Sequence, residues 1–167
     1  VCYLSPFENH PRAVAALALS RALWGNSPET LRRVRDPLQL RDVLTRNGFV
    51  APRLAVSNDA NGPNASNDAE WLVKPFSSGG GNRIRHWEGE RVPRTSYLQE
   101  RIDGTPGSIL FAAAGGRCVP LGLSRQLAGD PNFGATGYRY CGSILAPLED
   151  PQFTSGHALL ATATAMA

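Results

Sequence analysis

The first part of the chain carries a hydrophobic pattern that predicts helices. Alanine and leucine are dense over residues 11–24, and the run stops at a glycine, which predicts a helix with a glycine C-cap. Ser27 and Asp36 each precede a proline, as capping residues do where a helix begins. Gln39 lies at capping-box spacing from Asp36, and the helix that begins there is predicted to end at Gly48.

Beyond residue 50 the pattern changes to short apolar runs and alternation, which predict strands. The predicted strands are 52–56, 71–73, 82–87, 96–102, 108–114, 118–126 and 138–145. Gly115 and Gly116 join two of these runs and predict a hairpin. A polar stretch at 58–68 predicts an exposed loop, and the alanine-rich run at 156–166 predicts a last helix. The order of the predicted elements, with helices first, then mainly antiparallel strands and then a further helix, indicates the α+β class.

One predicted strand ends in a lysine and opens directly into a run of serines and glycines. Lys74 is the only lysine among 17 basic residues, and residues 77–81 read Ser-Ser-Gly-Gly-Gly. Glycines let backbone NH groups converge on anionic oxygens, while an ammonium adds a mobile point charge. The segment therefore predicts a polyphosphate site. A surface lysine beside an ordinary loop is the alternative, because a glycine run alone is a weak signal.

Composition narrows the classes of function. The chain has 167 residues, 42% of them hydrophobic and 19% charged, which fits one soluble globular domain or a piece of one or two. The net charge of +3 suits an anionic nucleotide, but no basic stripe alternates with aromatic residues, so no nucleic-acid partner is expected. No apolar run reaches the length of a membrane span, so no membrane partner is expected either.

The cysteines and the chain ends add two expectations. Cys2, Cys118 and Cys141 are scattered without ligand spacing, so the sequence indicates neither a metal site nor a disulfide framework. Reduced thiols of this kind predict a cytoplasmic location. The chain starts at Val1 rather than at a methionine and stops inside the last predicted helix, so we expect a fragment that is open at both ends.

Four segments, in this order, resemble the ATP-grasp superfamily. They are 26–52 with its two helix starts, 71–81 with Lys74 and the glycine run, 97–104, and the hairpin within 108–126. The likeness is greatest to uncharacterised, carboligase-type members related to carboxylate-amine ligases. It implies an ATP-grasp fold in which two α+β subdomains surround an ATP cleft, with the C-terminal part missing. Residues 1–25 would end a preceding α/β domain or form a linker helix, 26–95 would form the N-terminal subdomain, and 96–167 would form an incomplete C-terminal subdomain.

The resemblance also implies roles for individual residues. Lys74 would contact the α- and β-phosphates of ATP. The loop that closes over the phosphates would consist of Ser77, Ser78, Gly79, Gly80 and Gly81. The adenine-binding hinge would consist of Gln99, Glu100, Arg101, Ile102 and Asp103. The acidic residue that binds ribose in many members falls here near Pro106, which leaves the Asp103 carboxylate as a substitute or as an ordinary turn residue.

Charged side chains outside these segments are further candidates. Four arginines on predicted strands or loop edges could meet the γ-phosphate or an acyl phosphate, since guanidinium pairs well with such oxygens. They are Arg83, Arg85, Arg125 and Arg139, of which Arg125 is the preferred catalytic residue. His86 could act as a general base, with a structural role as the alternative.

The activity implied by the resemblance is an ATP-dependent ligase that activates a carboxylate as an acyl phosphate and joins it to an amine or similar nucleophile. Its partners would be ATP and a small-molecule carboxylate, and the sequence does not set the oligomeric state. The resemblance also implies Mg²⁺ as a cofactor. We expect no metal ligand within this chain and place the family's magnesium ligands beyond residue 167, so the fragment itself is expected to be inactive. A non-catalytic nucleotide-binding module and a glycine-rich-loop kinase are the alternatives.

Overall fold

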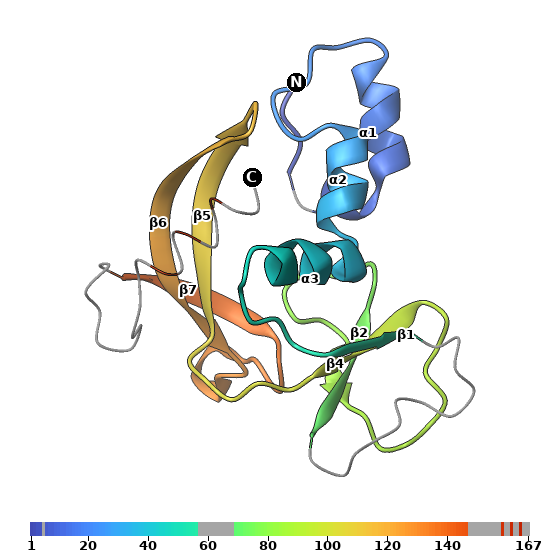
Figure 1. The fold of residues 1–167 in the computed structure, drawn as a ribbon, viewed down its shortest axis with the longest axis vertical. Helices are drawn as coiled ribbons and strands as arrows, with labels where there is room; N and C mark the ends of the chain where they lie inside the picture. The colour runs from blue at the N-terminus through green and yellow to red at the C-terminus, as the bar shows by residue number, and fades with distance from the viewer. Residues whose placement is uncertain (5, 57–68, 147–157, 159–160, 162–163, 165–167) are drawn as a thin grey trace.

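The computed structural model of the chain describes residues 1–4, 6–56, 69–146, 158, 161 and 164. Figure 1 shows helices in the first part of the chain and strands in the remainder. The helical elements are η1 (Phe7–Asn9), α1 (Pro11–Ala18), α2 (Pro28–Val34), α3 (Pro37–Arg46) and η2 (Pro131–Phe133). The strands are β1 (Leu54–Val56), β2 (Trp71–Pro75), β3 (Arg85–His86), β4 (Ser96–Glu100), β5 (Gly107–Ala114), β6 (Arg117–Ala128) and β7 (Tyr140–Ala146).

The first helix is shorter than its hydrophobic pattern predicts. α1 ends at Ala18, and Leu19 is 91% exposed. The chain beyond it turns back to the N-terminus, where the NH of Trp24 donates to the carbonyl oxygen of Val1 at 2.9 Å. This pairing competes with continued helix, so the prediction of one helix over 11–24 was wrong in its second half.

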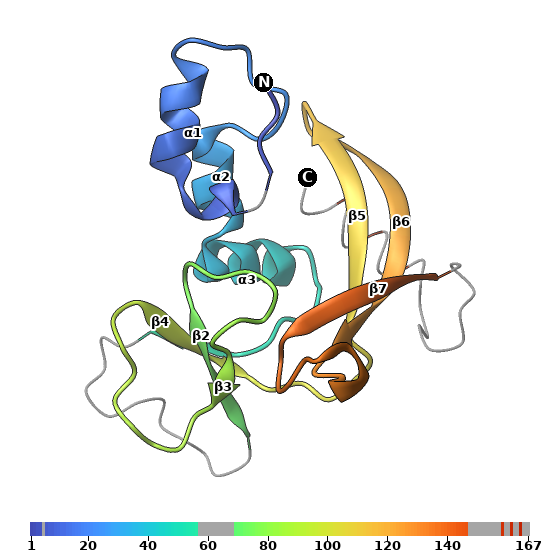
Figure 2. The same cartoon turned by 180° about the vertical axis from the view of Figure 1, so that it is seen from behind.

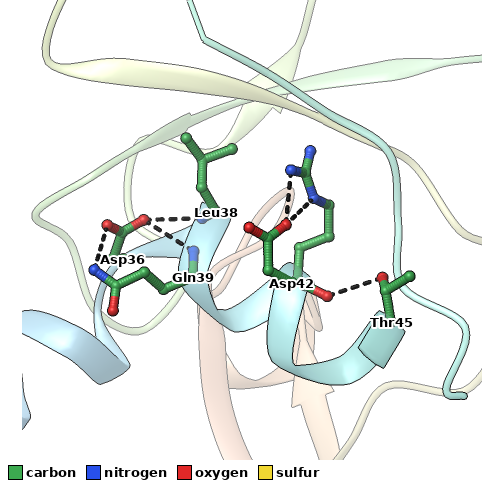
Figure 3. A network of polar contacts seen from close by, with 6 residues as sticks. Asp36, Leu38, Gln39, Asp42 and Thr45 are labelled. Atoms are coloured by element: carbon green, nitrogen blue, oxygen red, sulfur yellow. Dashed lines mark hydrogen bonds and ion pairs between the residues drawn. The ribbon is translucent and has the colours of Figure 1, made fainter. Parts of the chain in front are cut away.

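The predicted starts of α2 and α3 are confirmed by their caps. The Ser27 hydroxyl accepts from the NH of Thr30 at 3.1 Å. Asp36 Oδ1 accepts from the NH groups of Leu38 at 2.9 Å and Gln39 at 3.3 Å, as Figure 3 shows. The Gln39 side chain donates to Asp36 Oδ2 at 3.1 Å, so it supports the capping carboxylate instead of closing the expected capping box on the backbone.

Among the described residues, the strands form two antiparallel sheets. The four-stranded sheet has the order β1-β4-β2-β3, and the three-stranded sheet has the order β5-β6-β7. The predicted hairpin at Gly115 and Gly116 is present as the β5–β6 pair, with Ala114 opposite Arg117. The predicted return strand at 82–87 is reduced to β3. Figures 1 and 2 show the two sheets as separate units, with α3 close to the four-stranded one.

The two faces of the four-stranded sheet differ. Side chains of Trp71, Val73, Val92 and Leu98 form a buried cluster on one face. Because side chains alternate along a strand, Lys74 and its cross-strand partner Tyr97 lie on the opposite face. The apolar cluster thus fixes which way the lysine points, since a register slip of one residue would bury it in the core.

Two sequence predictions fall largely outside the described residues. These are the exposed loop at 58–68 and the last helix at 156–166, of which only 158, 161 and 164 are described, and these three are helical. Within the part of the chain that is described, no helix has the length and apolar character needed to cross a membrane.

Candidate functional site

The ammonium of Lys74 is held at the end of β2 by its neighbour strand. Lys74 is paired with Tyr97 in the β2–β4 ladder, and Gln99 lies two residues further along β4 on the same face. Lys74 Nζ donates to Gln99 Oε1 at 3.0 Å. This hydrogen bond is a direct side-chain contact between Lys74 and the segment that begins at Gln99.

Lys74 is partly buried, and this burial lowers the pKa of its ammonium below the ordinary value. Desolvation disfavours the charged form, and the Gln99 amide oxygen offers a dipole but no opposite charge. A bound anion would supply that charge and would favour the protonated form. An anionic ligand beside this side chain would therefore raise its pKa.

A cavity of about 320 Å³ opens beside Lys74. It lies between the Lys74 face of the sheet and the junction of α2 with α3, and the loop that follows β2 forms a further wall. Its lining includes two cations, Lys74 and Arg35, together with the phenol ring of Tyr97. Burial raises the pKa of Tyr97, so this ring stays neutral at ordinary pH. The cavity therefore offers positive charge and hydrogen-bond donors beside apolar walls.

The loop between β2 and β3 supplies Ser78, Gly79, Gly80 and Gly81 to this cavity. Gly80 and Gly81 have φ values of +58° and +69°, a region that favours glycine. The Ser78 hydroxyl donates to the carbonyl oxygen of Asn82 at 2.7 Å, which closes the loop on itself. The predicted loop residues therefore lie together beside Lys74. Ser77 is the exception, since it does not line the cavity and its carbonyl oxygen accepts from Arg83 at 3.2 Å.

The same loop touches the segment that leads into β7. The NH of Tyr140 donates to the carbonyl oxygen of Gly80 at 2.9 Å. A Cβ atom on Gly81 would lie 1.7 Å from the carbonyl oxygen of Tyr138, so only glycine fits there without movement. The Tyr138 hydroxyl is also 3.0 Å from His86 Nε2. This hydrogen bond occupies one ring nitrogen of the histidine that was a candidate general base. The loop is thus held against the chain of the second sheet.

Arg35 is a residue of the cavity that the sequence did not single out. Its Nη2 donates to Asn9 Oδ1 and to the carbonyl oxygen of Ser78, each at 2.5 Å, and its Nη1 lies 3.5 Å from Glu8 Oε1. The available signal was its place directly before the Asp36 cap, where it closes the basic stretch 32–35. Only the tertiary fold brings this junction beside the glycine loop.

None of the hinge candidates, residues 99–103, lines the cavity, although Gln99 contacts Lys74. The Glu100 carboxylate accepts from the guanidinium of Arg53 at 3.1 Å and from the backbone NH of Arg53 at 3.0 Å. These hydrogen bonds lower the pKa of Glu100. Arg101 pairs with Glu70 at 2.7 Å and with Asp103 at 2.6 Å.

The backbone NH groups of the same hinge are engaged as well. Those of Glu100 and Arg101 donate to carbonyl oxygens of Arg53 and Glu70 at 2.9 and 2.8 Å. Ile102 is 63% exposed. The predicted adenine-binding role of these residues stays a prediction, and Gln99 is the one of them that contacts the cavity's lysine.

Arg125, the predicted catalytic arginine, lies in the three-stranded sheet. It is paired with Gly107 on β5 and Ile144 on β7. It is half-buried and does not line the cavity beside Lys74. Its catalytic role stays a prediction.

Mg²⁺ is the metal that the fold family implies. Within the described ranges, no group of three or more His, Cys, Asp or Glu side chains is placed to hold a metal ion. The cavity wall supplies cations and glycines, whereas Mg²⁺ takes oxygen ligands such as carboxylates. These residues do not fit a magnesium site.

Comparisons with known proteins identify the family and the fold. A family model described as an ATP-grasp domain matches residues 34–156. A solved structure from Archaeoglobus fulgidus, whose description names the ATP-grasp superfamily, aligns with a TM-score of 0.64 and 15% sequence identity. The alignment covers 93% of this chain and 44% of that one, so this chain spans less than half of the other protein. No curated protein matches the sequence.

The family match covers both the Lys74 loop and the three-stranded sheet, and the aligned structure confirms the α+β fold predicted from the sequence. The chain therefore belongs to the ATP-grasp family of ATP-binding domains.

Proposed function

We propose that the cavity beside Lys74 binds the phosphate tail of ATP and that the chain is the ATP-binding part of an ATP-dependent ligase. The observation that carries the proposal is the shared cavity of a partly buried ammonium and a glycine loop. Backbone NH groups in such a loop and a flexible ammonium together suit phosphate oxygens. The family match supports the choice of ATP as the ligand.

The proposed reaction joins a small-molecule carboxylate to an amine or a similar nucleophile. The carboxylate oxygen attacks the γ-phosphorus, the bond to the bridging oxygen of ADP breaks, and an acyl phosphate forms. The nucleophile then attacks the acyl carbon, and phosphate leaves with the bonding electron pair. An acyl phosphate hydrolyses in water, so the reaction needs a closed site.

The described residues support three parts of this chemistry. Lys74 would neutralise charge on the phosphates, and the loop from Ser78 to Gly81 would enclose them. The contact between Gly80 and Tyr140 holds the loop against the chain of the second sheet, which would restrict the entry of water.

The test is calorimetric titration of ATP into the intact protein, with and without magnesium, followed by measurement of ADP release with mixtures of acids and amines. We expect ATP to bind and ADP and phosphate to appear only when both substrates are present. ATP binding without ADP release would favour a non-catalytic module. A phosphorylated product without free phosphate would favour a kinase. Absence of ATP binding would contradict all three functions.

A further inference from the structure

Two cations line the cavity, but only Lys74 comes from the strand and loop segment that the proposed function uses. Arg35 comes from the junction of α2 and α3. Its guanidinium is fixed from two sides, since Nη2 donates both to the Asn9 side chain and to the carbonyl oxygen of Ser78. Guanidinium groups suit phosphate because several donors lie in one plane. A fixed guanidinium in the cavity wall is thus prepared for an anion.

A carboxylate of the chain itself lies beside the Arg35 guanidinium. Glu8 Oε1, from η1, is 3.5 Å from Arg35 Nη1. The same oxygen is 3.6 Å from the point that a Cβ on Gly79 would occupy. A carboxylate therefore lies between a guanidinium and a glycine of the loop, two groups that could equally receive a phosphate oxygen.

The contact of Glu8 with Arg35 is weak enough to be exchanged. Its distance of 3.5 Å exceeds the 2.7–2.9 Å range of strong charge-assisted hydrogen bonds, and both side chains are partly exposed. Exposed ion pairs contribute little to stability. A phosphate group carries more charge and more acceptor oxygens than a carboxylate, so it would compete well for the same guanidinium.

We propose that Arg35 is a second binding residue for the anionic tail of the nucleotide and that Glu8 is its resting counterion, which the ligand displaces. The inference rests on the proposed function for its ligand. Binding is then an exchange of anions at Arg35, and the N-terminal segment that carries Glu8 restrains the affinity of the site. Since Arg35 also holds Ser78, the exchange takes place at the base of the glycine loop.

The experiment compares the wild-type protein with Glu8→Gln, Arg35→Gln and the double variant by calorimetry, using ATP and inorganic tripolyphosphate as probes at physiological ionic strength. We expect Glu8→Gln to tighten binding of both probes several-fold and Arg35→Gln to weaken it about tenfold, the scale of one charge-assisted contact. In the double variant the gain from Glu8→Gln should be much smaller, because the counterion acts chiefly through its ion pair with Arg35.

The matched control is Glu29→Gln, which removes the same charge from an exposed position in the first turn of α2. It should change affinity much less than Glu8→Gln, since long-range effects of exposed charges are screened. If Arg35→Gln does not fold, as judged by circular dichroism, the comparison of Glu8→Gln with Glu29→Gln decides the proposal. Unchanged or weaker binding by Glu8→Gln would overturn it.

The two probes separate this inference from the proposed function. Tripolyphosphate binding with the expected pattern, but no binding of ATP, would support the exchange at Arg35 and would contradict the nucleotide site. If ATP binds and its affinity is unchanged by both substitutions, the nucleotide site would be supported and the exchange at Arg35 would be contradicted. Binding of neither probe would contradict both.

Discussion

The carbonyl oxygen of Tyr138 lies where a side chain on Gly81 would have to be, 1.7 Å from an ideal Cβ. Two segments distant in the sequence meet here without space for a methyl group. The neighbouring hydrogen bond from the NH of Tyr140 to the carbonyl oxygen of Gly80 holds the same contact. The glycine at 81 therefore serves two needs, its positive φ and its close approach to another backbone.

Replacing Gly81 with alanine should separate these two segments. The left-handed conformation alone costs about 1 kcal/mol for alanine, and the clash with a backbone oxygen must add to it. We expect a loss of about 2 kcal/mol or more in the free energy of unfolding, measured by urea denaturation. Gly89→Ala is the matched control, because Gly89 has φ +92° but nothing within 4 Å of its Cβ position. Equal losses in the two variants would show that the contact with Tyr138 contributes nothing.

Removing the ammonium of Lys74 should weaken ATP binding. Lys74→Met keeps the apolar length of the side chain but loses the charge, and we expect a loss of about 1.5–3 kcal/mol in binding free energy, the scale of a charge-assisted hydrogen bond. Lys74→Arg should also impair binding, because a planar guanidinium cannot keep the same contact with Gln99 in a partly buried position. Calorimetry measures both changes. Wild-type affinity in Lys74→Met would remove this residue from the site.

Because burial lowers the pKa of Lys74, we expect the affinity of the proposed ATP site to depend on pH. As pH rises through the lowered pKa the ammonium loses its proton, so affinity should fall at a pH below the ordinary value of 10.5. Titrations above about pH 8 keep the phosphates fully ionised. Lys74→Met should lose this dependence, whereas Tyr97, with its raised pKa, should not contribute within the window. A profile shared by both proteins would point to another group.

The same shift predicts the pH dependence of stability. Between the lowered pKa and 10.5 the unfolded chain binds more protons at Lys74 than the folded chain does. The free energy of unfolding should therefore rise with pH across this window, by the contribution of this one residue. Urea denaturation of the wild type and of Lys74→Met, compared at each pH, isolates that contribution. A falling difference would contradict burial as the cause of the shift.

Removing the cap of α3 should destabilise the junction that carries Arg35. Asp36 accepts from two backbone NH groups at the start of α3 (Figure 3), and loss of such a cap costs about 1 kcal/mol. Asp36→Ala should lower the free energy of unfolding by that amount in thermal or urea denaturation. Asp42→Ala is the control, since its ion pair with Arg41 at 2.9 Å is partly exposed and worth less. A larger loss in Asp42→Ala would contradict this reading of the cap.

The order of elements and several local details were predictable from the sequence. Ser27 and Asp36 mark helix starts because their side chains satisfy nearby backbone NH groups, which is a local effect. The turn at Gly115 and Gly116 is local in the same sense. Lys74 before a glycine run was recognisable because all of its parts are adjacent in the sequence.

Tertiary contacts decided what local pattern could not. α1 ends early because the chain after it pairs with the N-terminus, which no periodicity reveals. Arg35, Glu8 and the glycine loop meet through contacts across up to 43 residues. The sequence by itself determined where a helix or turn begins and which residues carry the chemistry proposed for phosphate. The folded chain alone decided which charges face the cavity, because burial and ion pairing depend on neighbours that are distant along the backbone.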